Sequence, residues 1–380
     1  NGSIVKQLFL FSTPIMLANL LQVSYQFIDS LWVGNLLGAN PLGAITVAST
    51  VIVTVLSFII GINHATLTIL SQQRGKGNEK GLKSYLNAFV VVLSILSLVA
   101  GFIGFIFSEH ILLMLDTPPD MLADANAYLR INFIGILFLL GYNFISSVLR
   151  SLGDSKTPLT FVLVAVILNT ILDPVFILVF GWGIEGAAYA TVFSQGISFL
   201  YGLIYTLRNK LVPFSIPTVP SMEEVWLILK LGIPSGLQMM VIHAGVLAIL
   251  SVVNGFGENV VAGFGASQRI DSLITLPAMA LGTAVNSMAG QNIGAGRWDR
   301  VRQLAIYGAV YNFAIMLLIA VVIFFSAEFL IGLFIQNGEA ASFGSEYLRI
   351  IAFFYPFIGL NFILNGIVRG SGAMYQVLIL

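Results

Sequence analysis

Residues 84–107 read SYLNAFVVVLSILSLVAGFIGFIF, a run without a single charged side chain. A helix needs roughly 20 apolar residues to cross a bilayer, so this run is long enough to span one. The whole chain has the same character, because 58% of its residues are hydrophobic and only 9% are charged. Soluble domains carry about 25% charged residues. The composition therefore predicts a membrane protein and excludes a soluble enzyme.

Apolar runs of this kind recur along the chain, separated by glycine, proline and charged residues. We expect ten, at residues 8–36, 43–70, 84–107, 127–149, 158–180, 184–206, 226–254, 260–287, 303–325 and 345–368. The runs are too long for the strands of a membrane barrel and do not alternate between polar and apolar residues, so each is expected to form an α-helix.

The charged residues between these spans predict the orientation. If the N-terminus is cytoplasmic, all of the 17 Lys and Arg residues lie in or beside inner loops except Arg130, Arg269 and Arg349. Acidic residues dominate the opposite loops. Basic residues remain on the cytoplasmic side of membrane proteins, so odd-numbered spans should run outward and even-numbered spans back.

The two halves of the chain resemble each other at an offset of about 219 residues. The segment Tyr128-Leu129-Arg130-Ile131 recurs as Tyr347-Leu348-Arg349-Ile350, and the pair Arg150 and Gly153 recurs as Arg369 and Gly372. Each copy should hold six spans, and an even number keeps both copies in the same orientation. We therefore expect two six-helix bundles related by a pseudo-twofold axis along the membrane normal. Twelve spans are expected in total, of which about ten are present in this sequence.

The repeat also predicts the domain organisation. Residues 1–210 should form an N-terminal lobe with spans one to six. Residues 211–380 should form a C-terminal lobe with spans seven to ten and the start of an eleventh, with the remaining spans of that lobe missing.

Two acidic residues in the N-terminal half are the main candidates for a functional site, because ionisable groups at membrane depth are costly. Asp29 lies in the first span and Asp173 in the fifth, where Asn169 is four residues earlier and so on the same helix face. Thr191 lies in the sixth span. At about 1.5 Å per residue, Asp29, Asp173 and Thr191 lie roughly 10–12 Å below the outer edge of the spans. They could therefore share one pocket.

Two carboxylates close together in a low-dielectric pocket resist ionising at the same time. A carboxylate that exchanges its proton easily is what a proton-driven transporter requires. The oxygens of Asp29, Asn169, Asp173 and Thr191 could instead hold Na⁺. A purely structural role, with hydrogen bonds that pack the bundle, is the third interpretation. Pro174 should bend the helix beside Asp173.

Further residues are candidates for binding a flat, lipophilic cation. Aromatic rings attract cations and methionine adapts its shape, so Tyr25, Tyr142 and Met16 are assigned to substrate binding together with Asn143 and Asp29. In the eighth span, Arg269 and Asp271 are only two residues apart and cannot face each other on a helix. A structural ion pair of each with another helix is the favoured interpretation there, with a transport role as the alternative.

Several enzyme signatures are absent from the sequence. There is no Walker A motif, no G-x-S-x-G, no H-E-x-x-H and no cysteine. We therefore expect no catalytic residues, no cofactor and no metal site apart from the possible Na⁺ site. The basic loops are explained by topology and require no nucleic acid. The expected partners are small lipophilic cations and the lipid bilayer, and the chain is expected to be a monomer.

The combination of two six-span repeats, Pro14 and Asp29 in the first span, and Asn169-x-x-x-Asp173-Pro174 in the fifth resembles the MATE multidrug efflux family. The prokaryotic DinF-type branch is the most similar. This resemblance implies a V-shaped pair of bundles, cation-coupled antiport, export of lipophilic cations and a location in the prokaryotic cell membrane. It also implies that Asp29, Asn169, Asp173 and Thr191 form a proton or cation site in the N-terminal lobe. A protonation-linked bend of the first span near Pro14 is implied as well.

Three alternatives to proton-coupled drug antiport remain open on the sequence. The coupling ion could be Na⁺. The chain could flip lipid-linked sugars, although such flippases usually carry more basic residues in their cavity than the single deep Arg269 found here. It could also be a channel, although the repeat and the buried acids favour alternating access.

Overall fold

A computed structural model describes residues 2–336 and 338–380, and this part of the chain is helical without a strand. Its helices are long and apolar. Eight of them could each cross a membrane, or up to ten spans are present if each of two bent helix pairs counts as one span. The prediction of an all-α polytopic membrane protein is confirmed.

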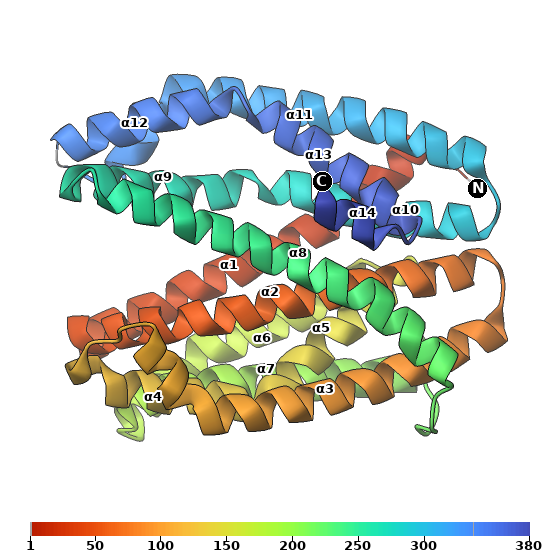
Figure 1. Ribbon diagram of the computed structural model, residues 1–380, viewed down its shortest axis with the longest axis horizontal. Helices are drawn as coiled ribbons and strands as arrows, with labels where there is room; N and C mark the ends of the chain where they lie inside the picture. The colour runs from red at the N-terminus through yellow and green to blue at the C-terminus, as the bar shows by residue number, and fades with distance from the viewer. Residues whose placement is uncertain (1, 337) are drawn as a thin grey trace.

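The helices form two bundles that lie side by side (Figure 1). The first contains α1 (Ile4–Leu37), α2 (Ala39–Gly75), α3 (Glu79–Met114), α4 (Pro119–Ile134), α5 (Ile136–Ser151), α6 (Lys156–Pro174), the π-helical turn η1 (Val175–Val179) and α7 (Gly183–Arg208). The second contains α8 (Met222–Asn254), α9 (Glu258–Ile274), α10 (Leu276–Gly294), α11 (Trp298–Gly332), α12 (Gly338–Ala352), α13 (Tyr355–Gly370) and α14 (Met374–Ile379). We call these the N-terminal and C-terminal bundles.

Two of the expected spans are broken rather than straight. The fourth consists of α4 and α5, which meet at Gly135 with a bend of 49°, and the tenth consists of α12 and α13, with a bend of 50°. These breaks are related by the sequence repeat, because they follow the two copies of the Tyr-Leu-Arg-Ile segment. The second half of each broken span contacts a helix of the other bundle, with α5 against α10 and α13 against α2.

Two helices cross from one bundle to the other. The first turns of α1 pack in a hydrophobic cluster with α10 and α11, through Leu8 and Ile15, whereas Ala18 and Val33 belong to the core of the N-terminal bundle. The first turns of α8 likewise pack on the N-terminal bundle, through Ile228. In Figure 1, α8 runs diagonally across the front from one bundle to the other. The two bundles are therefore connected by more than the linker between α7 and α8.

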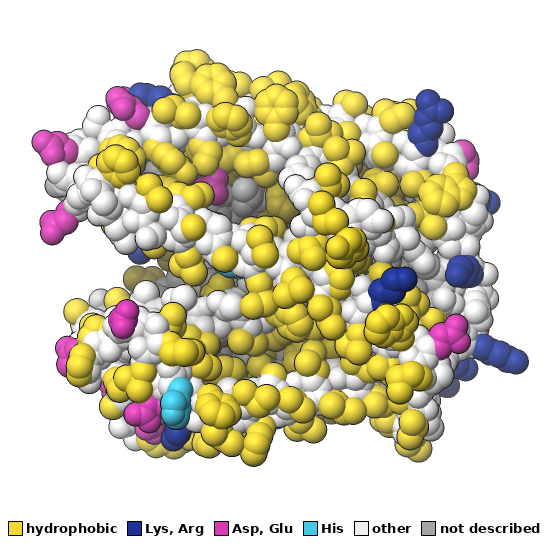
Figure 2. Space-filling model, viewed as in Figure 1, with side chains coloured by type: hydrophobic (Ala, Val, Ile, Leu, Met, Phe, Trp, Pro, Cys, Tyr) yellow, Lys and Arg dark blue, Asp and Glu magenta, His cyan; other side chains and the backbone are white. Residues whose placement is uncertain are grey.

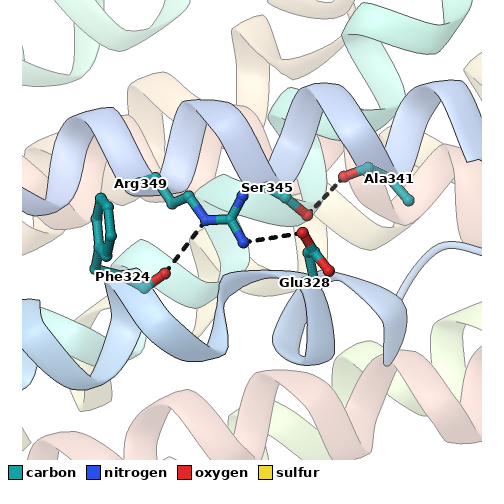
Figure 3. Close-up of polar contacts among 5 residues, drawn as sticks. All are labelled: Phe324, Glu328, Ala341, Ser345 and Arg349. Atoms are coloured by element: carbon teal, nitrogen blue, oxygen red, sulfur yellow. Dashed lines mark hydrogen bonds and ion pairs between the residues drawn. The ribbon is translucent and has the colours of Figure 1, made fainter.

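The repeat is visible in the contacts of two arginines. Arg349 on α12 binds Glu328 on α11, with 2.9 Å between Nη2 and Oε1, and donates through Nε to the Phe324 carbonyl at 3.3 Å (Figure 3). The counterpart Arg130 on α4 donates to Ser108 on α3 at 3.3 Å, and its guanidinium lies 5.1 Å from the centre of the Phe105 ring. Each arginine thus ties a short helix to the long helix before it.

The two ends of the molecule differ in charge. We call the end with the α2–α3 and α10–α11 loops the basic end and the opposite end the acidic end. Most Lys and Arg side chains in Figure 2 lie toward the basic end and most Asp and Glu side chains toward the acidic end. The surface between them is largely hydrophobic, as expected for a protein that faces lipid. The same view shows a hollow between the bundles that opens at the acidic end.

Candidate functional site

Asp29 and Asp173 lie near each other inside the N-terminal bundle. Asp29 projects from α1 and its residue is 8% exposed, whereas Asp173, at the end of α6, has no exposed surface. The two carboxyl groups are close enough for their charges to interact. Their proximity agrees with the expectation from equal depth, and it arises because α1, α6 and α7 pack together in this bundle.

Asn169 connects the two acids to the third helix. Its side-chain nitrogen lies 3.5 Å from the hydroxyl of Tyr25 on α1 and 3.5 Å from Thr191 Oγ1 on α7. The Thr191 hydroxyl itself donates to the Ala187 carbonyl at 3.2 Å, so its oxygen is free to accept from Asn169. The structure thus brings Asp29, Asn169, Asp173 and Thr191 into one group.

This group is rich in buried acceptors that no donor satisfies. Among the described residues, Oδ1 of Asp29, Oδ1 of Asn169 and both carboxyl oxygens of Asp173 have no hydrogen-bond partner. A buried charge without a partner costs several kcal/mol or more, and buried polar atoms are normally bonded. An array of acceptors without donors is therefore suited to bind a proton or a small cation.

Asp29 faces a cavity of about 330 Å³, and Asp173 does not. Tyr25, Asp29 and Thr191 are part of the cavity wall, whereas Asn169 and Asp173 lie outside it. Asp29 therefore stands between the cavity and the fully buried Asp173. A ligand in the cavity can therefore contact Asp29 but not Asp173.

Several cavity residues were not among the sequence candidates. The wall includes Thr46 and Ser49 of α2, Tyr128 and Asn132 of α4, and Gln195 of α7. Two of these pairs have a recognisable signal, because Tyr128 and Asn132, like Thr191 and Gln195, are four residues apart and share a helix face. Nothing in the sequence indicates that α2 and α4 would face Asp29.

Other sequence candidates lie apart from this cavity. Met16, Tyr142 and Asn143 are not part of its wall. Asn143 donates to the Leu139 carbonyl of its own helix at 2.8 Å, and Met16 packs in the cluster shared by α1, α10 and α11. Tyr142 is buried, and its hydroxyl oxygen lies 3.4 Å from Nε2 of Gln22. The structure therefore groups only Tyr25 of the aromatic candidates with Asp29.

The two prolines assigned to conformational change lie in different surroundings. Pro14 lies inside a continuous α1, at the point where this helix passes from the C-terminal to the N-terminal bundle. Pro174 ends the α-helical part of its span, and the π-helical turn η1 follows it directly. A proline removes one backbone donor, which explains the local change of helix type beside Asp173.

The expected ion pairs of Arg269 and Asp271 are not present. The salt bridges within residues 2–336 and 338–380 are Arg74–Glu79 and Arg349–Glu328. Arg269 is exposed, and Asp271 instead lies near the hydroxyl of Tyr355 on α13. The error arose because the sequence shows two opposite charges in one span but does not show which way each one points.

The described residues contain no group of three or more His, Asp and Glu side chains that could hold a metal ion. A monovalent ion such as Na⁺ needs fewer charged ligands. The two carboxylates with the oxygens of Asn169 and Thr191 form a compact set of the hard donors that Na⁺ accepts, so this group fits Na⁺ as well as a proton.

Comparison with known proteins agrees with this architecture. The MatE family model matches residues 14–175 and 234–380. A Bacillus subtilis (strain 168) protein named "Probable multidrug resistance protein YpnP" is 64% identical over 379 residues, which cover all of this chain and 85% of that protein. "Probable multidrug resistance protein YoeA" from the same organism is 31% identical, over 98% of this chain and 82% of that protein.

A solved structure of similar fold is the Vibrio cholerae MATE transporter VcmN in the bent form. It aligns with a TM-score of 0.93 at 23% sequence identity, covering 99% of this chain and 86% of that one. The family model matches well over half of the chain, the curated relatives extend over nearly all of it, and the fold is shared throughout. The chain belongs to the MatE family, and it is a multi-pass membrane transporter rather than an enzyme.

Proposed function

We propose that this chain exports lipophilic cationic drugs in exchange for protons. The names of the curated relatives support the drug part of this proposal, since two of them are described as probable multidrug resistance proteins. The single observation that carries the proton part is the group of buried acceptors, in which Asp29 faces the cavity and Asp173 lies behind it.

The exchange follows from competition for Asp29. When Asp29 is ionised, its carboxylate attracts a cation in the cavity, and the ring of Tyr25 adds a cation–π contact. When a proton binds, the carboxylate becomes neutral and the cation loses its main attraction. Asp173 adds a second carboxyl group behind Asp29, and one proton bound by this pair is released to the cavity when the cation binds.

The cavity is formed within one chain, so a monomer can perform this exchange. The expected orientation puts the basic end in the cytoplasm of a prokaryotic cell and the acidic end outside it. In this orientation the hollow in Figure 2 faces outward, which supports assigning this conformation to the state that releases drug and receives protons.

Na⁺ is the second candidate for the coupling ion, because the same oxygens can coordinate it. Flipping of lipid-linked sugars has less support, since the cavity wall contains no Lys or Arg to bind phosphate. A channel is also less well supported, because the acids are buried inside one bundle instead of along a pore between the bundles.

Efflux measured in inverted membrane vesicles distinguishes these possibilities. We expect uptake of a lipophilic cation such as ethidium to follow an imposed pH gradient and to be independent of Na⁺. Asp29→Asn should reduce it to the level of vesicles without transporter, whereas Asp120→Asn, at an exposed acid of the acidic end, should leave it unchanged. Uptake that follows a Na⁺ gradient and ignores pH selects sodium coupling. Unchanged uptake by Asp29→Asn refutes the assignment of the site.

A further inference from the structure

The basic end is closed by contacts between the two bundles that are related by the sequence repeat. Gln72, in the last turns of α2, donates through Nε2 to the Gly370 carbonyl of α13 at 2.8 Å. Gln291, its counterpart on α10, donates through Nε2 to the Ser151 carbonyl of α5, also at 2.8 Å. Each bundle thus binds the end of the equivalent helix in the other bundle.

A second pair of hydrogen bonds repeats the arrangement one turn earlier. Thr68 on α2 donates to the Arg369 carbonyl at 2.9 Å, and Ser287 on α10 donates to the Arg150 carbonyl at 2.8 Å. In both pairs the acceptor is a carbonyl in the last turn of a helix, which makes fewer bonds within its own helix. The donors are buried or half-buried, so water does not compete freely for them.

Two glycines allow the backbones to approach closely at the same place. A Cβ atom added to Gly75 would lie 1.9 Å from the Gln291 carbonyl oxygen, and one added to Gly294 would lie 2.1 Å from the Gln72 carbonyl oxygen. Both distances are far below van der Waals contact. The crossing of α2 and α10 at the basic end therefore requires glycine on both helices.

We propose that Gln72, Gln291, Thr68 and Ser287, together with the crossing at Gly75 and Gly294, form a two-part latch that holds the basic end closed. The hollow of the molecule opens at the acidic end in this structure, and a transporter that alternates its access must also open at the basic end. Both halves of the latch must then break, because each connects one bundle to the other.

The latch rests on alternating access in a MatE transporter and is independent of the coupling ion. Its residues lie outside the cavity that contains Asp29. At the usual net strength of a hydrogen bond, loss of one bond shifts the ratio of closed to open molecules by about five-fold, and loss of two by about 25-fold. Gln→Met is the suitable change, because methionine has nearly the same length and lacks the donor.

The chain contains no cysteine, so spin labels can be placed without other changes. The repeat-related, exposed positions Lys80 and Asp299 report the separation of the bundles at the basic end. We expect the double variant Gln72→Met/Gln291→Met to increase the population with a long distance between these labels. Gln73→Met is the matched control, because the Gln73 side chain accepts a hydrogen bond from Asn78 in the adjacent loop of the same bundle. An unchanged distance distribution in a folded double variant overturns the proposal.

A second change tests the latch without removing any hydrogen-bonding group. Gly75→Ala should force α2 and α10 apart, and alanine favours the helix, so the helix itself remains intact. Gly245→Ala on α8 is the control, since nothing lies within 4 Å of a Cβ added there. We expect only Gly75→Ala to lengthen the Lys80–Asp299 label distance. A closed basic end in folded Gly75→Ala contradicts the proposed crossing.

These measurements need no drug and no ion gradient. Drug uptake by Asp29→Asn in vesicles is a separate measurement, and the two results together distinguish the latch from the coupling site. If the latch variants open the basic end and Asp29→Asn still transports drug, the latch stands and the proposed coupling fails. If the latch variants stay closed while Asp29→Asn abolishes transport, the reverse holds.

Discussion

Asp29 forms part of the wall of the cavity in the N-terminal bundle, whereas Asp173, whose charge interacts with it, has no exposed surface. The two acids therefore have different access to a ligand. A cation in the cavity can contact Asp29 directly, whereas Asp173 can act on it only from a distance, without contact. This difference predicts different effects of removing each charge.

Asp173→Asn should reduce drug binding less than Asp29→Asn does. We expect Asp29→Asn to weaken binding of a lipophilic cation by ten-fold or more, since a direct charge-assisted contact contributes on the order of 1.5–3 kcal/mol. Asp173→Asn should leave binding within about three-fold of the unchanged protein while still reducing proton-coupled transport. Equilibrium binding by fluorescence polarisation measures the first effect and vesicle uptake the second. Equal losses of affinity in the two variants would argue against the order of the two acids.

Drug affinity should fall as the pH falls. Protonation removes the negative charge of Asp29, and the proton and the drug therefore exclude each other at this position. For one proton displaced per drug, the dissociation constant rises by at most ten-fold for each unit of acidification. Binding isotherms measured at a series of pH values test this, and Asp29→Asn should flatten the dependence. A pH-independent affinity in the unchanged protein would be inconsistent with competition.

The cavity residues found only in the structure should contribute to drug recognition. Gln195 lies one turn from Thr191 on α7 and lines the same cavity. We expect Gln195→Ala to change the apparent affinity for drugs by several-fold while leaving the ratio of protons to drug unchanged. Asn143→Ala is a useful comparison, because Asn143 bonds to its own helix and is not part of the cavity wall. An effect of Asn143→Ala equal to that of Gln195→Ala would place the substrate elsewhere.

The salt bridge of Figure 3 should contribute little to stability. Glu328 is largely exposed, with a side-chain relative accessibility of 75%, and an exposed ion pair contributes about 0–1 kcal/mol. Glu328→Gln should therefore leave the apparent unfolding temperature in detergent nearly unchanged. Arg369→Met should lower it more, because the buried Arg369 donates to Gln238 Oε1 at 2.6 Å and joins α13 to α8. A larger loss in Glu328→Gln would reverse this ranking.

The sequence predicts the spans and the grouping of the acids for simple physical reasons. Apolar runs longer than a bilayer form helices, and residues at equal depth on adjacent helices can meet. The convergence of Asp29, Asn169, Asp173 and Thr191 needed only the further assumption that the first, fifth and sixth spans pack together. The structure supplies that packing, and the functional role of the group stays a prediction.

The sequence does not predict features that depend on the direction in which a helix runs. The adaptable side chain of Met16 makes it a candidate for the substrate cavity together with Tyr25, yet α1 passes from one bundle to the other between these two residues. The bend between α4 and α5 occurs at Gly135 without a proline, and a glycine inside an apolar run does not by itself predict a bend of 49°. Arg269 and Asp271 have no ion pair because their surroundings are set by the packing of the C-terminal bundle.

The most direct test of proton exchange at Asp29 is drug-dependent proton release from the purified protein in weakly buffered detergent solution. Addition of a lipophilic cation should release about one proton per drug bound from the unchanged protein, as each drug displaces a proton from the acid pair. Asp29→Asn should release none, and Asp120→Asn should behave like the unchanged protein. Proton release that persists in Asp29→Asn, or drug binding without release in the unchanged protein, would contradict the proposed exchange at Asp29.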